Sequence, residues 1–186
     1  MHRVLTTVVV MSCLAAAGAA QAPKTHRLEA TPSTVAYGWY DAAGKPVLTI
    51  ASGDIIDVDT LLTNRPAGLL RAGVPENQIQ QSLKDIEAQV PQDQRGPGGH
   101  ILTGPVFVEG AEPGNVLEIR ILSIDLAIPY GYNGCSGFLR SNCEQGAGSK
   151  IIPLDEKKMT ATFAPGIVIP LKPFFGSMGV APPPAQ

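Results

Sequence analysis

Residues 98–114 read GGHILTGPVFVEGAEPG, and this stretch contains the two signals from which the fold is predicted. Residues 106–108 (Val-Phe-Val) are a short β-branched and aromatic run of the kind found in strands. Turn residues stand on both sides of it: Gly104 and Pro105 before, and residues 112–115 after, whose central Pro-Gly favours a type II turn. A short strand between tight turns is the unit that this stretch predicts.

The same unit recurs along the chain. Twenty glycines and 17 prolines favour turns over long helices. In residues 116–124 apolar and polar residues alternate at first, which predicts a strand with one buried face. The expected strands are 34–40, 47–50, 55–60, 106–108, 116–124, 151–154, 159–163 and 167–171. We therefore expect a mainly β, sandwich- or barrel-like domain.

Residues 62–99 break this rhythm and predict the one clear helix. Ile79, Leu83, Ile86 and Val90 recur at helical spacing, and Pro75 suits a helix start. The result is one short amphipathic helix within a long insertion between strands. Such an insertion is either a lid or site wall, or a peripheral addition.

The N-terminus has the layout of a secretory signal peptide. A short basic start precedes an apolar stretch, and Ala20-Gln21-Ala22 forms a small-x-small cleavage pattern. An uncleaved apolar helix and a lipoprotein modified at Cys13 are the alternatives. We expect residues 1–22 to be a signal peptide, residues 23–186 to form one domain, and the protein to be exported to the periplasm or secreted.

The charge pattern excludes some partner classes. The formal net charge is −2, and without Arg3 it becomes about −3. No cluster of basic residues is present, so we expect no nucleic-acid partner and no binding to an anionic membrane. The apolar run of the signal segment is too short for a membrane span.

Cys135 and Cys143 are the two cysteines that remain after the signal segment, and both lie in a polar, glycine-containing loop. In an oxidising compartment they can close a small disulfide loop. The alternatives are weaker, because a metal site lacks further ligands nearby and a catalytic cysteine lacks a base close in sequence.

His100 is the first candidate for a catalytic or metal-binding residue. It follows two glycines, which let the backbone approach a ligand closely, and its imidazole can act as a base toward water or as a ligand of a divalent metal. A lone histidine is more often structural or simply exposed, and no second histidine stands at a metal-binding spacing nearby.

Neighbouring polar residues give further candidates. Thr103 can orient a substrate or hydrogen-bond to His100, although a turn hydroxyl usually bonds to nearby backbone. Glu109 and Glu112 can supply a carboxylate for acid–base catalysis, or they can be solvated turn residues.

Asp57 and Asp59 share one face of the expected strand 55–60 and can chelate a cation, or they can form the solvated face of an edge strand. Tyr37, Trp39 and Tyr40 can line a small pocket or pack in the core.

Motifs of nucleophilic catalysis and nucleotide binding are missing. The sequence has no Gly-x-Ser-x-Gly elbow, no phosphate-binding loop and no dinucleotide fingerprint. Hydrolysis by this chain would therefore use an activated water.

From residue 28 to residue 183 the sequence resembles the N-terminal part of the acetamidase/formamidase family. Residues 99–114 are similar to the family's His-x-Leu-Thr-Gly-Pro and Val-Glu-Gly-Ala-Glu-Pro-Gly signature. Shorter similar pieces are 37–41, 46–50, 52–54 and 175–182.

The resemblance implies a hydrolase acting on carbon–nitrogen bonds other than peptide bonds, which converts small linear amides such as formamide or acetamide to ammonia and a carboxylate. It also implies a mainly β fold. His100 and Thr103 fall in the site-forming motif, Asp59 matches an acidic strand position, and a divalent metal bound by His100 and Asp59 is one possibility.

The sequence departs from the family pattern in three places. Asn115 stands where the family usually has Asp, and Ala36 replaces a frequent histidine. The later acidic segments of the family are missing after residue 183, so we expect a truncated chain with little or no activity on its own. The alternative from another class is a noncatalytic exported β module that binds a small ligand or a partner chain, and a homo-oligomer is compatible with either.

Overall fold

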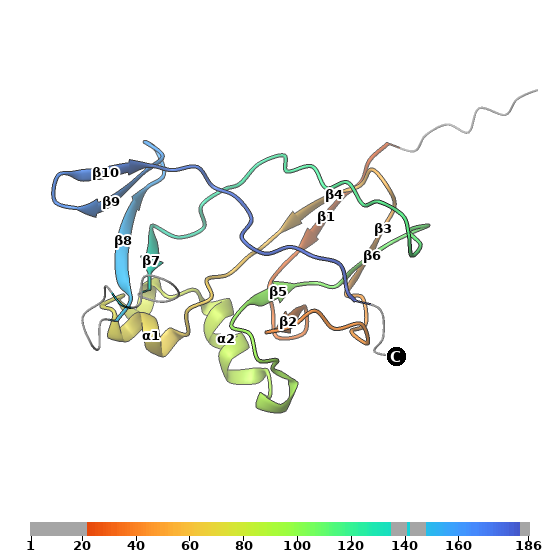
Figure 1. Cartoon of the computed structure of the whole chain (residues 1–186), viewed down its shortest axis with the longest axis horizontal. Helices are drawn as coiled ribbons and strands as arrows, with labels where there is room; N and C mark the ends of the chain where they lie inside the picture. Colours follow the sequence, from red (N-terminus) through yellow and green to blue (C-terminus); the bar gives the residue numbers. More distant parts are fainter. Residues whose placement is uncertain (1–21, 135–140, 142–147, 183–186) are drawn as a thin grey trace, which may run out of the picture.

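The computed structural model describes residues 22–134, 141 and 148–182. Cys135 and Cys143 lie outside the described residues, and so does the signal segment apart from Ala22, so the disulfide and the signal peptide stay predictions. Figure 1 shows the elements in space. The strands are β1 (Thr25–Leu28), β2 (Val35–Tyr37), β3 (Leu48–Ile50), β4 (Ile55–Val58), β5 (Ile101–Thr103), β6 (Val106–Val108), β7 (Tyr130–Asn133), β8 (Lys150–Asp155), β9 (Thr160–Ala164) and β10 (Ile167–Pro170). The helices are α1 (Pro66–Arg71) and α2 (Gln81–Gln89), with the 3₁₀ turns η1 (Glu76–Gln78) and η2 (Gln92–Gln94).

The mainly β class is confirmed, and the strands of the described chain form four small sheets. Three are two-stranded: β1–β4 and β3–β6 are parallel, and β2–β5 is antiparallel. The fourth is the antiparallel sheet β10-β9-β8-β7. In Figure 1 this four-stranded sheet lies at one end of the molecule, and β1, β4, β3 and β6 lie at the other.

The core lies where the helical segment meets the β2–β5 pair and β7. Its buried cluster consists of Ala30, Tyr37, Leu69, Val74, Ile79, Leu83, Ile86, Val90, Ile101 and Tyr130. Six of these ten residues belong to residues 62–99. The insertion is therefore not a peripheral addition, because it supplies most of this cluster, whereas its role as a lid or site wall stays a prediction.

The predicted helical face is confirmed, with a shifted start. Ile79, Leu83, Ile86 and Val90 are all buried. The α-helix begins at Gln81 because Ile79 and Gln80, which follow the separate turn η1, have non-helical backbone angles. Helix α1 was not predicted, since six residues are too few to show a helical period.

The expectation of a half-buried strand at residues 116–124 is wrong. Residues 116–123 are exposed, and the segment forms no strand in the described part of the chain. Alternation marks a sequence that can form a strand, but a strand also needs a hydrogen-bonded neighbour. The structure adds three strands that were not predicted, namely β1, β5 and β7.

No helix among the described residues is long and apolar enough to cross a membrane.

Helix α1 offers a matched test of the core. Leu69 is completely buried, whereas its neighbour Leu70 is 47% exposed. We expect Leu69→Ala to lower the free energy of unfolding by about 2–5 kcal/mol through loss of burial and creation of a cavity. Leu70→Ala should cost less than about 1 kcal/mol. Denaturant unfolding of both variants measures this, and equal losses would contradict the described core.

Candidate functional site

His100 stands at the entrance to β5, where the chain runs beside residues that follow β2. Its carbonyl oxygen accepts a hydrogen bond from the N–H of Gly38 at 2.7 Å, and its side chain is exposed. Two more bonds extend this contact, from Gly96 N to Tyr37 O at 2.8 Å and from Gly98 N to Gly38 O at 3.1 Å. The backbone of His100 is thus held in place while its imidazole faces solvent.

The glycines around His100 allow backbone segments to touch. A Cβ on Gly98 would lie 2.6 Å from the carbonyl oxygen of Gly38, and one on Gly96 would lie 2.8 Å from Cγ of Trp39. Gly38 also has a φ of +84°, which favours glycine. By contrast, a Cβ on Gly99 would meet nothing within 4 Å. The loop is therefore tightly packed up to Gly98 and open immediately before His100.

Aromatic side chains border this loop. Tyr37 is buried in the core, whereas Trp39 and Tyr40 are nearly half exposed. A Cβ on Gly179 would lie 3.0 Å from the Tyr40 ring, so the segment after β10 passes directly against it. Figure 1 shows this segment returning from β10 toward the β2–β5 pair.

Arg95 anchors the loop to the core, and the sequence analysis did not single it out. Its side chain is 5% exposed, and its guanidinium donates to the carbonyls of Glu87 (2.6 Å) and Val90 (2.8 Å) at the C-terminal end of α2. The carboxylate of Glu87 lies 2.9 Å away. The guanidinium also lies 4.7 Å from the centre of the Tyr37 ring. A cation at this end of a helix binds carbonyls that lack intrahelical donors.

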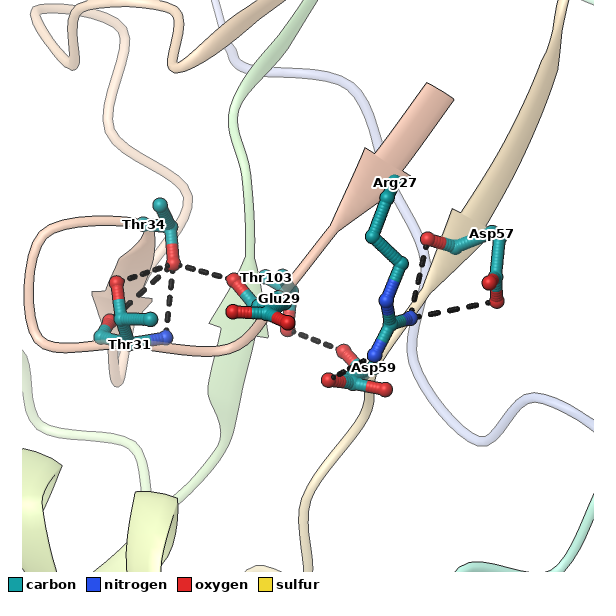
Figure 2. Close-up of polar contacts among 7 residues, drawn as sticks. All are labelled: Arg27, Glu29, Thr31, Thr34, Asp57, Asp59 and Thr103. Carbon is teal, nitrogen blue, oxygen red and sulfur yellow. Dashed lines mark hydrogen bonds and ion pairs between the residues drawn. The ribbon is translucent and has the colours of Figure 1, made fainter. Parts of the chain in front are cut away.

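Thr103 lies at the other end of β5 from His100. Its hydroxyl donates to the carbonyl oxygen of Asp59 at 2.7 Å, as Figure 2 shows. At about 3.3 Å per residue, the two positions are roughly 10 Å apart along the strand and point to opposite faces. Thr103 therefore joins β5 to the segment after β4 and is not placed to hydrogen-bond the imidazole.

Asp57 and Asp59 do share a cation, and it is a side chain of this chain. Arg27 Nη2 lies 2.6 Å from Asp59 Oδ2, and Nη1 lies 3.3 Å from Asp57 Oδ1 (Figure 2). The parallel register sets Arg27 opposite Asp57. The hydrogen bond to Asp59 raises the pKa of Arg27 above its ordinary value.

The fold does not bring His100 and Asp59 together as ligands of one metal. His100 precedes β5, whereas the carbonyl oxygen of Asp59 accepts a hydrogen bond from Thr103 at the other end of this strand. The carboxylate of Asp59 binds Arg27. No group of three or more His, Cys, Asp or Glu side chains among the described residues can hold a metal ion.

Glu109 follows β6, with its N–H donating to the carbonyl of Ile50 at 2.8 Å and its side chain exposed. Two strands, β5 and β6, separate it from His100. The three residues predicted to be catalytic thus lie before β5, at the end of β5 and after β6. Their catalytic roles stay predictions.

A second histidine forms a pair that sequence reasoning missed. His26 Nε2 donates to Asp54 Oδ2 at 2.9 Å, and the N–H groups of Lys24 and Ala51 donate to the same carboxylate. The bond from Lys24, followed by those from His26 and Ala51, lowers the pKa of Asp54 to about 2 from an ordinary value of 3.8. This pair connects β1 to the turn before β4.

Two cavities lie away from His100. One of about 260 Å³ is lined by Glu29, Ala30, Thr31, Pro32, Asp59, Gln81, Ser82 and Asp85. The other, of about 360 Å³, is lined by Thr63, Asn64, Arg65, Ala67, Gly68, Arg71 and Glu87. Neither includes His100, Thr103 or Glu109. The candidate site is therefore His100 with the loop of residues 96–99 (the glycine loop) and the aromatic residues beside it.

Sequence comparison matches residues 71–185 to the Acetamidase/Formamidase family. The chain belongs to this family. The matched range contains the glycine loop, His100, Thr103, Glu109 and the segment that packs on Tyr40. Residues 28–70, with Trp39 and Asp59, lie outside it. A search of curated proteins gave no match. Membership in this family indicates a hydrolase that acts on amides.

The role of Arg95 as the anchor of the glycine loop can be tested against a matched control variant. We expect Arg95→Met to lower the free energy of unfolding by about 2–4 kcal/mol, because Glu87 loses its closest cation and two helix carbonyls lose donors. The fluorescence of Trp39, the only tryptophan, should change as well, because its ring packs on the adjacent Gly96.

Arg65→Met is the control. Arg65 approaches the same carboxylate at 3.7 Å with a 61% exposed side chain, so its loss should cost less than about 1 kcal/mol. Similar losses of stability in both variants would contradict an anchoring role for Arg95.

The lowered pKa of Asp54 predicts that the free energy of unfolding decreases in acid. A carboxylate with a lowered pKa stabilises the fold above its unfolded pKa of about 4, and this contribution disappears as the pH falls toward about 2. Thermal unfolding between pH 6 and pH 2 should therefore show a smaller loss of midpoint in Asp54→Asn than in the parent chain. The variant should also be less stable at pH 6. Parallel curves for the two proteins would contradict the assignment.

Proposed function

We propose that this protein is an amidase-type hydrolase that cleaves the C–N bond of small linear amides such as formamide and acetamide, with His100 as the catalytic base. One observation carries the proposal: the family match includes a histidine whose backbone is fixed by Gly38 and whose imidazole is exposed beside an open glycine. Such a side chain can meet a small solute without rearrangement of the core.

In this proposal the imidazole of His100 accepts a proton from a water molecule as the water oxygen attacks the amide carbonyl carbon. The C–N bond then breaks, and the nitrogen leaves as ammonia after it receives a proton, which the imidazolium can return. The remaining acyl group and the water oxygen form a carboxylic acid, whose proton passes to the released ammonia. The products are therefore a carboxylate and an ammonium ion, and water is the only co-reactant.

The surroundings of His100 support a small substrate. Trp39 and Tyr40 offer apolar surface for the carbon end of a short amide, and Gly99 leaves room for it near the imidazole. Thr103 enters the proposal as a positioning residue, because its bond to the Asp59 carbonyl fixes the direction of β5.

The test is ammonia release from formamide and acetamide by the purified protein. We expect His100→Ala to lower kcat/KM by about 10²–10⁴-fold, the usual contribution of a general base. His26→Gln is the control, because it changes the other histidine of the described chain and retains a donor for Asp54. It should keep the parent rate.

Circular dichroism of each variant checks that the fold is intact. Because the sequence predicts little activity for this chain on its own, the parent rate is compared with the uncatalysed rate of each amide. A folded parent protein that releases ammonia no faster than the uncatalysed rate would overturn the proposal. Full turnover by His100→Ala would show that the base is another group.

A further inference from the structure

Residues 116–122 (Val-Leu-Glu-Ile-Arg-Ile-Leu) form an exposed apolar segment between β6 and β7. Val116 is 96% and Leu122 71% exposed, and Leu117, Ile119 and Ile121 are each about half exposed. Figure 1 shows this connection running along the edge of the molecule opposite the helices. An apolar stretch of this size is uncommon on a surface that stays in water.

The backbone of this segment is also unpaired. Within the described chain, backbone hydrogen bonds reach Asn115 on one side, whose N–H donates to Glu112, and Pro129 on the other, whose carbonyl accepts from Leu154. None lies between these two residues. Glu118 and Arg120 contact each other at 2.6 Å and are both mostly exposed, as residues on one side of an extended chain can be. A free strand with unpaired N–H and C=O groups is a template for another strand.

The sequence of the segment is complementary to itself in the antiparallel direction. If Ile119 lies on a two-fold axis, Glu118 faces Arg120 of the second copy, and Arg120 faces Glu118. On the other side of the ribbon, Leu117 faces Ile121 and Ile119 faces its own copy. Cross-strand pairs of opposite charge and of apolar side chains are the ones that stabilise sheets.

We propose that residues 116–122 pair with the same residues of a second copy of this chain, as a two-stranded antiparallel ribbon centred on Ile119. The two ion pairs specify this register, because a shift by one residue would move the charges out of alignment and exchange the faces. The interface is isologous, so it closes at a dimer.

The dimer is tested by sedimentation of the chain from Pro23 onward, which contains every residue of the core cluster, at concentrations of about 1–100 μM. We expect a monomer–dimer equilibrium. Glu118→Arg sets like charges opposite each other twice, and Arg120→Glu does the same. Each should raise the dissociation constant about tenfold or more.

Two combinations separate this register from a general effect of charge. An equimolar mixture of the Glu118→Arg and Arg120→Glu chains should regain association, because both charged cross-strand pairs in the heterodimer are again of opposite charge. The double variant, which exchanges the two charges, should form a homodimer like the parent. Glu76→Arg, at an exposed position of η1, is the control and should leave the equilibrium unchanged.

A parent chain that is monomeric throughout this range would overturn the proposal, and so would open assemblies larger than a dimer. Single variants with unchanged association, or a mixture no stronger than either single variant, would overturn the register. None of these readouts depends on amide hydrolysis.

Discussion

The position of Arg95 is the constraint on which the candidate site depends. Its guanidinium binds the end of α2, the carboxylate of Glu87 and the face of Tyr37, and so joins the helical segment to β2. The next residue begins the glycine loop, whose bonds to Tyr37 and Gly38 lead directly to His100. A charge buried to this degree is tolerated because each of the three guanidinium nitrogens donates to an oxygen and the plane of the group lies beside the Tyr37 ring. The arrangement explains how an exposed histidine can still have a defined position.

Most of the local structure could be predicted from the sequence, whereas the pairing of the strands could not. Seven of the eight expected strand segments contain a strand, and the apolar residues spaced along residues 79–90 form the buried face of the helical segment. The prediction of a strand at residues 116–124 is wrong because the alternation of apolar and polar residues shows which face a strand could bury. It does not supply the hydrogen-bonded neighbouring strand. The sequence does not predict the contribution of residues 62–99 to the core, because a long segment between strands is typical of a surface connection, although Leu69 and Val74 are apolar.

The contacts of the candidate site also depend on strand pairing, so the sequence does not predict most of them. The glycines before His100 predict close approach of the backbone to a ligand, which stays a prediction, and the structure places Gly96 and Gly98 against the backbone of Gly38. The cation bound by Asp57 and Asp59 could not be identified, because nothing local in the sequence indicates that Arg27 lies opposite Asp57 in a parallel pair. The pair of His26 and Asp54 depends on the same strand pairing. A single sequence does not show which distant strands pair, so it does not predict the side-chain interactions between them.

The contact between Gly179 and Tyr40 has a consequence for how the border of the site moves. The segment after β10 is largely exposed and contributes no residue to the buried core cluster. Regions with few buried contacts open at a small fraction of the global free energy. Release of this segment would uncover the ring of Tyr40 while the helices, Arg95 and the glycine loop keep their places. Release of the segment therefore changes the exposure of Tyr40 through a local opening equilibrium, separate from the cooperative unfolding of the domain, whereas the imidazole of His100 is already exposed.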